Sequence, residues 1–106
     1  MKALRFELCV ESLEAARAAE AGGADQVELC AALASGGLTP CAELMQATVR
    51  AVSIPVSVLI RPRHGSFHFT ASEFEFMRGQ IDAARRAGAA AVAVGALLAG
   101  GRVDVA

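Results

Sequence analysis

Hydrophobic and polar residues alternate along four short segments of the chain. In the first segment, residues 3–10, every second position from Leu4 onward is apolar, and Arg5, Glu7 and Cys9 lie between them. Since successive side chains of a strand point to opposite faces, this alternation predicts a β-strand with one mixed, polar face. The same reasoning predicts three further strands, over Gln26–Ala31, Val56–Arg61 and Ala90–Val94.

Between these strands the apolar spacing changes to that of an amphipathic helix. Ser12 is a typical N-cap for a helix over Leu13–Ala21, which Gly22 and Gly23 would end. Thr39 and Pro40 predict the start of a second helix that runs to about Ala51. A capping box that begins at Thr70 predicts a third helix, which Gly88 would end.

The resulting order, β-α-β-α-β-α-β with short loops, is typical of a parallel sheet. In an open, doubly wound sheet the central strands are apolar on both faces. Here one face of the first two strands is polar, which favours half of a TIM-type (β/α)8 barrel with four parallel strands and three intervening helices. Because a complete barrel needs about 250 residues, residues 1–106 are expected to form a single partial domain, truncated after the fourth strand. Such a half could pair with a second copy as a homodimer that closes the barrel, or could be a non-functional fragment.

Composition narrows the possible partners. The formal net charge is -1, and Tyr and Trp are absent, so neither a basic field nor stacking aromatic residues favour a nucleic-acid partner. The longest uncharged run, Ala87–Gly101, is shorter than the roughly 20 residues of a membrane span. The charged N-terminus lacks a signal-peptide apolar stretch, so a cytoplasmic location is expected.

Two cysteines form the most suggestive chemical pattern. Glu7-Leu8-Cys9 recurs as Glu28-Leu29-Cys30, near the ends of two strands that should be neighbours about 4.8 Å apart. The two thiols could therefore bind one metal ion, and two thiolates suit Cu(I). Zinc would need further ligands, and only Cys41, His64 or His68 could supply them. The alternative is that Cys9 and Cys30, like Cys41, are small buried packing residues.

Glu7 and Glu28 should share the polar face, where a carboxylate must be paired or protonated. They could form salt bridges with Arg5 or Arg61, or act as a general acid–base pair.

Arg61 and Arg63 follow the third strand and could bind the carboxylate or phosphate of a small anionic ligand. The alternative interpretation is that Arg61 neutralises Glu7 or Glu28 and that Arg63 is solvated.

Taken together, several segments resemble the CutC copper-homeostasis family in order and spacing, from about Leu4 to Asp104. These segments are Phe6–Ser12, Gly22–Cys30, Gly36–Pro40, Ile54–Val56, Ile60–Arg63 and Val94–Leu97. The resemblance implies the N-terminal part of a TIM-type barrel, a cytoplasmic location and a role in copper homeostasis. The family's proposed copper thiols match Cys9 and Cys30.

The function expected from these observations is Cu(I) binding through Cys9 and Cys30. The alternative is an enzyme acting on a small anion, with Glu7 and Glu28 as acid and base and Arg61 as anion clamp; no specific reaction can be assigned. The sequence departs from the family pattern at His64 and Ser66, where the family carries Gly and Asp, and at Gly100, where it usually carries an acidic residue.

Overall fold

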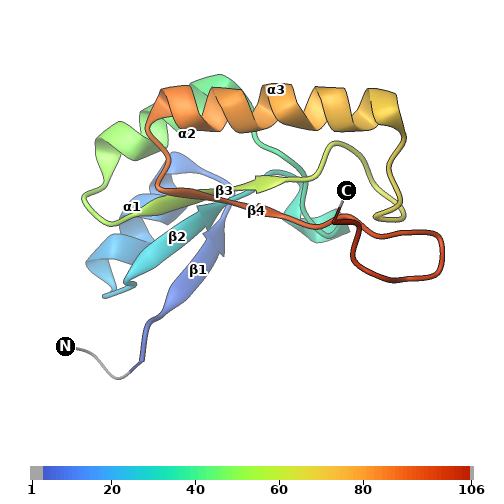
Figure 1. Ribbon diagram of the computed structural model, residues 1–106. Coiled ribbons are helices and arrows are strands. Elements are labelled where there is room, and N and C mark those ends of the chain that lie inside the picture. The colour runs from blue at the N-terminus through green and yellow to red at the C-terminus, as the bar shows by residue number, and fades with distance from the viewer. Residues whose placement is uncertain (1–3, 106) are drawn as a thin grey trace.

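A computed structural model describes residues 4–105 of the chain (Figure 1). Its strands are β1 (Glu7–Val10), β2 (Gln26–Leu29), β3 (Val56–Ile60) and β4 (Ala91–Val94). Its helices are α1 (Leu13–Ala21), α2 (Ala42–Ala51), α3 (Ala71–Ala87) and the short 3₁₀ helix η1 (Leu33–Ser35). No helix within residues 4–105 combines the length and apolar character that crossing a bilayer requires.

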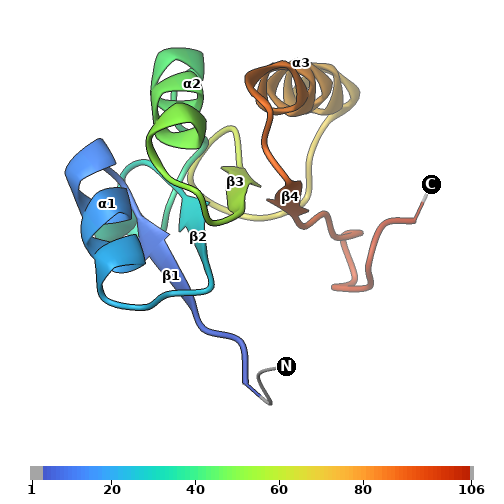
Figure 2. The same cartoon turned by 90° about the vertical axis from the view of Figure 1, so that its left-hand side faces the viewer.

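The four strands form one parallel sheet in the order β1-β2-β3-β4. Each strand is followed by an α-helix before its neighbour begins, and the three α-helices all cover the same face of the sheet (Figures 1 and 2). The predicted half of a (β/α)8 barrel is therefore confirmed. We call the sheet face turned away from the helices the open face.

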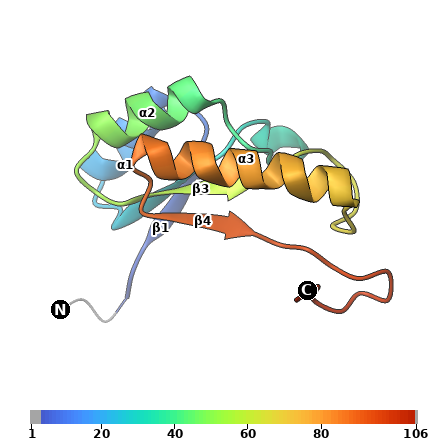
Figure 3. The same ribbon diagram turned by 45° about the horizontal axis from the view of Figure 1, so that its top comes forward.

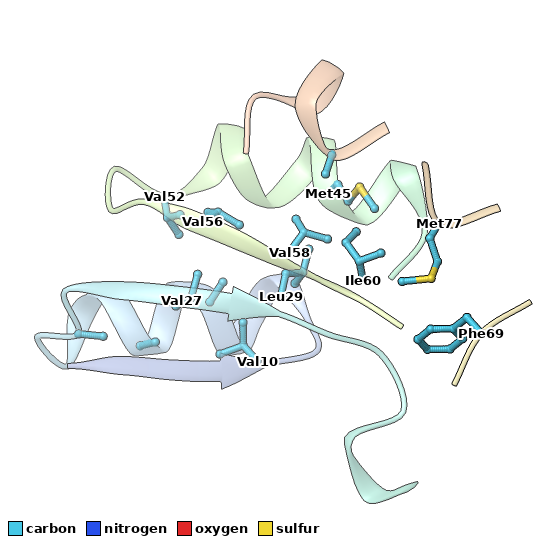
Figure 4. Close-up of a cluster of buried hydrophobic side chains, with 14 residues drawn as sticks. Val10, Val27, Leu29, Met45, Val52, Val56, Val58, Ile60, Phe69 and Met77 are labelled. Carbon is cyan, nitrogen blue, oxygen red and sulfur yellow. The ribbon is translucent and has the colours of Figure 1, made fainter. Parts of the chain in front are cut away.

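The hydrophobic core lies between the sheet and the helices (Figure 4). Val27 and Leu29 of β2 and Val56, Val58 and Ile60 of β3 are almost inaccessible to solvent. These residues alternate along their strands, so one side of β2 and one side of β3 enter the core. The helices contribute Ala16, Ala19, Met45, Met77 and Ala84, and Val52, which directly follows α2, joins them.

The predicted helix signals at Ser12, Thr70 and Gly88 are confirmed. The Ser12 side chain accepts a hydrogen bond from the Ala15 N–H at 3.0 Å. Thr70 and Glu73 form a complete capping box at the start of α3. Gly88 has a φ of 92°, the left-handed conformation that ends many helices.

The predicted start of α2 is wrong. Its N-cap is Cys41 rather than Thr39, and no side chain caps this end. The Thr39 hydroxyl accepts from the Arg61 N–H at 2.8 Å and lies 3.1 Å from Gln80 Oε1, an acceptor to which it donates. Thr39 therefore ties the end of β3 to α3 instead of capping a helix.

All four strands are shorter than the alternation predicts; β3 ends at Ile60 instead of Arg61, and β4 begins at Ala91 instead of Ala90. β1 begins at Glu7, because the Phe6 N–H bonds the Asp25 side chain; Ala3, the first predicted residue, lies outside the described residues. β2 ends at Leu29, after which Ala31 forms an isolated bridge with Leu38.

After β4 the chain forms a loop that extends beyond the sheet (Figure 3). Leu97 and Val103 form an isolated antiparallel bridge there, and the Leu97 N–H donates to the Phe67 carbonyl at 2.7 Å. This contact joins the segment after β4 to the loop after β3, at the carboxyl ends of the strands.

Candidate metal centre

A row of side chains crosses the open face of the sheet. In the strand register Cys9 lies opposite Glu28, and Glu28 lies opposite Ser57. Residues opposite one another in a parallel sheet project to the same face. Since their neighbours Val27, Leu29, Val56 and Val58 enter the core, this row points away from the helices.

Cys9, Glu28 and Cys30 form the group of potential metal ligands among the described residues. Their ligand atoms all lie within 4.8 Å of one another. Cys30 follows the last residue of β2 and is held beside β1, because its N–H donates to the Val10 carbonyl at 2.8 Å. Its side chain is buried, whereas Cys9 is exposed on the outer strand β1. The group therefore has one enclosed sulfur and one that solvent can reach.

The Cys30 thiol is positioned by Glu28. Its Sγ lies 3.4 Å from Glu28 Oε2 and 3.6 Å from the Glu28 carbonyl oxygen, and the thiol donates to these acceptors. Burial, and then this hydrogen bond and the negative charge of Glu28, raise the pKa of Cys30 far above its ordinary value. Burial and the Glu28 charge also raise the pKa of Cys9. Both thiols are therefore protonated near neutral pH, and a metal that binds them must displace their protons.

The alternative interpretation, in which all three cysteines are buried packing residues, is wrong for Cys9 and Cys41. Cys30 is buried, but Cys9 and Cys41 are exposed. The third potential ligand is Glu28, whereas Cys41, His64 and His68 do not join this group in the described part of the chain. The signal for Glu28 was already present in the sequence, since it shares a strand face with Cys30.

The salt-bridge interpretation of Glu7 and Glu28 is wrong. Within residues 4–105, neither carboxylate forms an ion pair with Arg5 or Arg61. Glu7 instead accepts hydrogen bonds from the side chains of Gln26 and Ser57, the latter at 3.3 Å. The Glu7 carboxylate thus accepts hydrogen bonds from neutral side chains, whereas the Glu28 carboxylate accepts one from the Cys30 thiol.

Arg61 is held by backbone rather than by a carboxylate. Its guanidinium donates to the carbonyls of Gly37 at 3.3 Å and Gly65 at 3.0 Å, and lies 4.9 Å from the centre of the Phe67 ring. A Cβ at Gly36 would lie 3.0 Å from Arg61 Nη1, so a side chain there would press on the guanidinium. The Nε of Arg61 is buried and has no hydrogen-bond partner among the described atoms.

Arg63 is not simply solvated. It makes two hydrogen bonds to the Glu73 carboxylate, of 2.5 and 3.1 Å, and its guanidinium lies 4.7 Å from the centre of the Phe69 ring. This pairing and the Thr70 N–H lower the pKa of Glu73 to about 2. Arg63 therefore fixes the loop after β3 to the start of α3, which leaves Arg61 as the arginine of this loop without a carboxylate partner.

The chain is similar to several proteins named CutC. The CutC family model matches residues 4–106. A family protein CutC from Rhizobium meliloti (strain 1021) is 49% identical over 104 residues, which are 98% of this chain and 42% of that protein. The human copper homeostasis protein cutC homolog is 45% identical over 99 residues, which are 93% of this chain and 36% of the human protein.

A solved structure shows the same arrangement. The crystal structure of a CutC protein from Streptococcus agalactiae superimposes with a TM-score of 0.88 at 28% identity, covering 95% of this chain and 50% of that one. The present chain thus spans about two fifths of the length of the curated relatives and half of the solved one.

Proposed function

The chain belongs to the CutC family, and from this membership and its thiol pair we propose that it contributes to copper homeostasis by binding Cu(I) through Cys9 and Cys30. One observation carries the proposal. Two strands bring two sulfur atoms within 4.8 Å at the carboxyl end of a parallel sheet, where ligands bind in α/β folds.

The separation of the sulfur atoms suits a shared ion. A metal–thiolate bond is about 2.3 Å long, so two sulfurs on opposite sides of one ion lie up to about 4.6 Å apart. The upper limit of 4.8 Å for Cys9 and Cys30 is therefore compatible with bridging after little movement. The exposed Cys9 would receive the ion from solvent, and the buried Cys30 would hold it against the sheet.

The chemistry of the group favours Cu(I) over zinc. Thiolates are soft ligands that select Cu(I), whereas structural zinc sites use four ligands. Within the described residues this group offers three ligand atoms, one of them a hard carboxylate oxygen from Glu28. Copper is the cargo here, and two sulfurs suffice to hold it.

We place this activity in the cytoplasm. All three cysteines of the chain are free, and two of them are exposed. Exposed free thiols persist in reducing compartments, which are also where Cu(I) is the stable form of the ion.

An anaerobic Cu(I) titration against a competing chelator tests the proposal. The native chain should take up about one ion with high affinity, and a Cys9→Ser, Cys30→Ser variant should lose this uptake while circular dichroism shows that it is folded. Cys41→Ser is the matched control, because Cys41 is an exposed cysteine outside the group, and it should bind like the native chain. Equal uptake by the native chain and the double variant would refute the proposal.

A second candidate function is supported by Arg61. This guanidinium lies at the end of β3 without an ion pair to any carboxylate among residues 4–105, so its charge is available to a small anionic ligand. In this alternative the chain is an enzyme, with Glu7 and Glu28 as acid and base. Titration with inorganic phosphate distinguishes the two: phosphate binding should disappear in Arg61→Ala and survive the Cys9→Ser, Cys30→Ser change.

A further inference from the structure

One loop connects the two candidate sites. It spans residues 30–37 after β2, and the short helix η1 within it lies at the carboxyl end of the sheet (Figure 1). The loop begins at Cys30, the buried thiol of the group of potential metal ligands, and ends at Gly37, whose carbonyl accepts from Arg61 at 3.3 Å. A Cβ at Gly37 would lie only 2.9 Å from Leu59 Cδ2, so the loop packs directly on the end of β3. The conformation of this loop therefore affects both the thiol and the guanidinium.

The loop contains a strained residue. Ala32 has a φ of 52° and a ψ of 46°, and it is the only residue other than glycine within residues 4–105 that has a positive φ. In this left-handed conformation the Cβ crowds the following carbonyl group, a cost that glycine does not have. A residue keeps such a conformation only where its surroundings impose it.

Hydrogen bonds within the loop contribute to holding Ala32. Its carbonyl accepts from the N–H groups of Ser35 and Gly37, each at 3.0 Å, and from the Ser35 hydroxyl at 3.1 Å. Ala31 and Leu38 exchange two backbone hydrogen bonds, of 2.8 and 2.7 Å, where the loop closes. All of these groups belong to one short stretch of chain, so these bonds can be lost together when the loop opens.

Glu11 ties the loop to a different part of the fold. It directly follows β1, the strand that carries Cys9, and its Oε2 accepts from the Leu33 N–H at 3.0 Å. The Leu33 N–H and the Ala32 carbonyl belong to the same planar peptide group. Because Glu11 binds one side of this peptide and the loop binds the other, the orientation of the peptide that sets the ψ of Ala32 is fixed from both sides.

We infer that Glu11 is a positioning residue, whose carboxylate holds the strained loop after β2 closed and thereby keeps Cys30 enclosed. Glu11 is not a member of the group of potential metal ligands, so it acts through the loop. The consequence for copper rests on the proposed function, whereas the hold on the loop does not.

Alkylation of Cys30 in the metal-free chain tests the inference. Site-specific mass spectrometry should find that Cys30 reacts about five to ten times faster in Glu11→Ala than in the native chain, the effect of one hydrogen bond on a local opening equilibrium. The Leu38 amide, which donates to the Ala31 carbonyl, should exchange its hydrogen faster as well. The Val58 amide, in the buried strand β3, should keep its native exchange rate and so report that the fold is intact.

Two further variants separate the hold on the loop from the effect of charge. Glu11→Gln removes the charge but keeps an acceptor oxygen, so its Cys30 should react nearly as slowly as in the native chain. Ala32→Gly, added to Glu11→Ala, removes the strain and should restore the slow reaction, since glycine adopts a positive φ without penalty. An unchanged Cys30 rate in Glu11→Ala would overturn the inference. So would a Glu11→Gln variant as fast as Glu11→Ala, or an Ala32→Gly change that restores nothing.

The release of copper distinguishes this inference from the copper proposal. If Cys30 holds Cu(I), opening of the loop exposes this ligand, and Glu11→Ala should speed the transfer of bound Cu(I) to a chelator. A native chain that binds no Cu(I), or a transfer rate that stays native while Cys30 alkylation accelerates, would refute the role of Cys30 in copper binding. The alkylation rates of the metal-free variants would still decide the role of Glu11.

Discussion

The Cys30 thiol lies 3.4 Å from the Glu28 carboxylate, which also lies directly across the sheet from Cys9. One carboxylate thus borders both candidate copper ligands. Its negative charge disfavours a second negative charge nearby, so each thiol keeps its proton until a cation replaces it. This arrangement would let the protein carry two metal-binding sulfurs without two reactive thiolates.

Substitution of Glu28 should make Cys9 more reactive. Because burial and the Glu28 charge raise the pKa of Cys9, the native thiol should react slowly at mildly alkaline pH. Glu28→Gln removes the charge, lowers the pKa of Cys9 and should therefore raise its alkylation rate. Site-specific mass spectrometry measures the rate, with exposed Cys41 as the internal control that stays unchanged. An unchanged Cys9 rate would show that Glu28 does not control this thiol.

Cys9 and Cys30 should resist forming a disulfide with each other. They are diagonal neighbours on adjacent strands, since Cys9 lies opposite Glu28. Strand spacing and rise place such Cα atoms about 8 Å apart, beyond the roughly 7 Å that a disulfide spans. After treatment of the Cys41→Ser variant with oxidised glutathione, intact-mass analysis should find no intramolecular bridge. A peptide pair linked through Cys9 and Cys30 would contradict this expectation.

The pairing of Arg63 with Glu73 should stabilise the chain at neutral pH and fail in acid. The pKa of Glu73 is about 2 in the folded chain, against an ordinary value of 4.5. A lowered pKa gives a contribution that is present above pH 4.5 and is lost as pH falls toward 2. The thermal midpoint of the native chain should therefore fall more steeply across this range than that of Glu73→Gln, which retains the capping box.

Glu75→Gln is the matched control for this titration. Glu75 lies on the same helix and pairs with exposed Arg78, and its substitution should leave the acid slope of the native chain unchanged. Parallel curves for the native chain and Glu73→Gln would count against a stabilising role of the Arg63–Glu73 pair.

Replacement of Thr48 should stabilise the fold. Thr48 is fully buried in α2, and its hydroxyl has no hydrogen-bond partner among the described atoms. Thr48→Val replaces the hydroxyl by a methyl group of similar size, and should raise the free energy of unfolding by about 1 kcal/mol. Thr48→Ser keeps the hydroxyl and loses a methyl, so it should destabilise by about 1 kcal/mol. Chemical denaturation measures both, and a Thr48→Val variant less stable than the native chain would contradict the assignment.

The architecture could be predicted from the sequence because its signals are local. Alternation along the strands, the capping box at Thr70 and the glycine at Gly88 act within a few residues. The prediction that Thr39 caps α2 failed because its hydroxyl accepts a hydrogen bond from the Arg61 N–H, a backbone group distant in the sequence. A tertiary contact of this kind has no signature in the neighbouring sequence.

The candidate site was predictable only in part. The repeated Glu-Leu-Cys pattern placed Cys9, Glu28 and Cys30 on one face, and the structure brings their ligand atoms together. The partners of Arg61 were not predictable from the sequence, because they are backbone carbonyl groups. Every residue carries such a carbonyl, so no residue type marks the partner. The partner of Arg63, Glu73, lies beyond the loop on the next helix.

X-ray absorption at the copper edge tests the central claim most directly. When the Cys41→Ser variant is loaded anaerobically with one equivalent of Cu(I), the spectrum should show two sulfur ligands per copper. Cys9→Ser in the same background should reduce the sulfur count. A copper ion bound by nitrogen and oxygen alone, or a sulfur count unchanged by Cys9→Ser, would contradict binding by the paired thiols of Cys9 and Cys30.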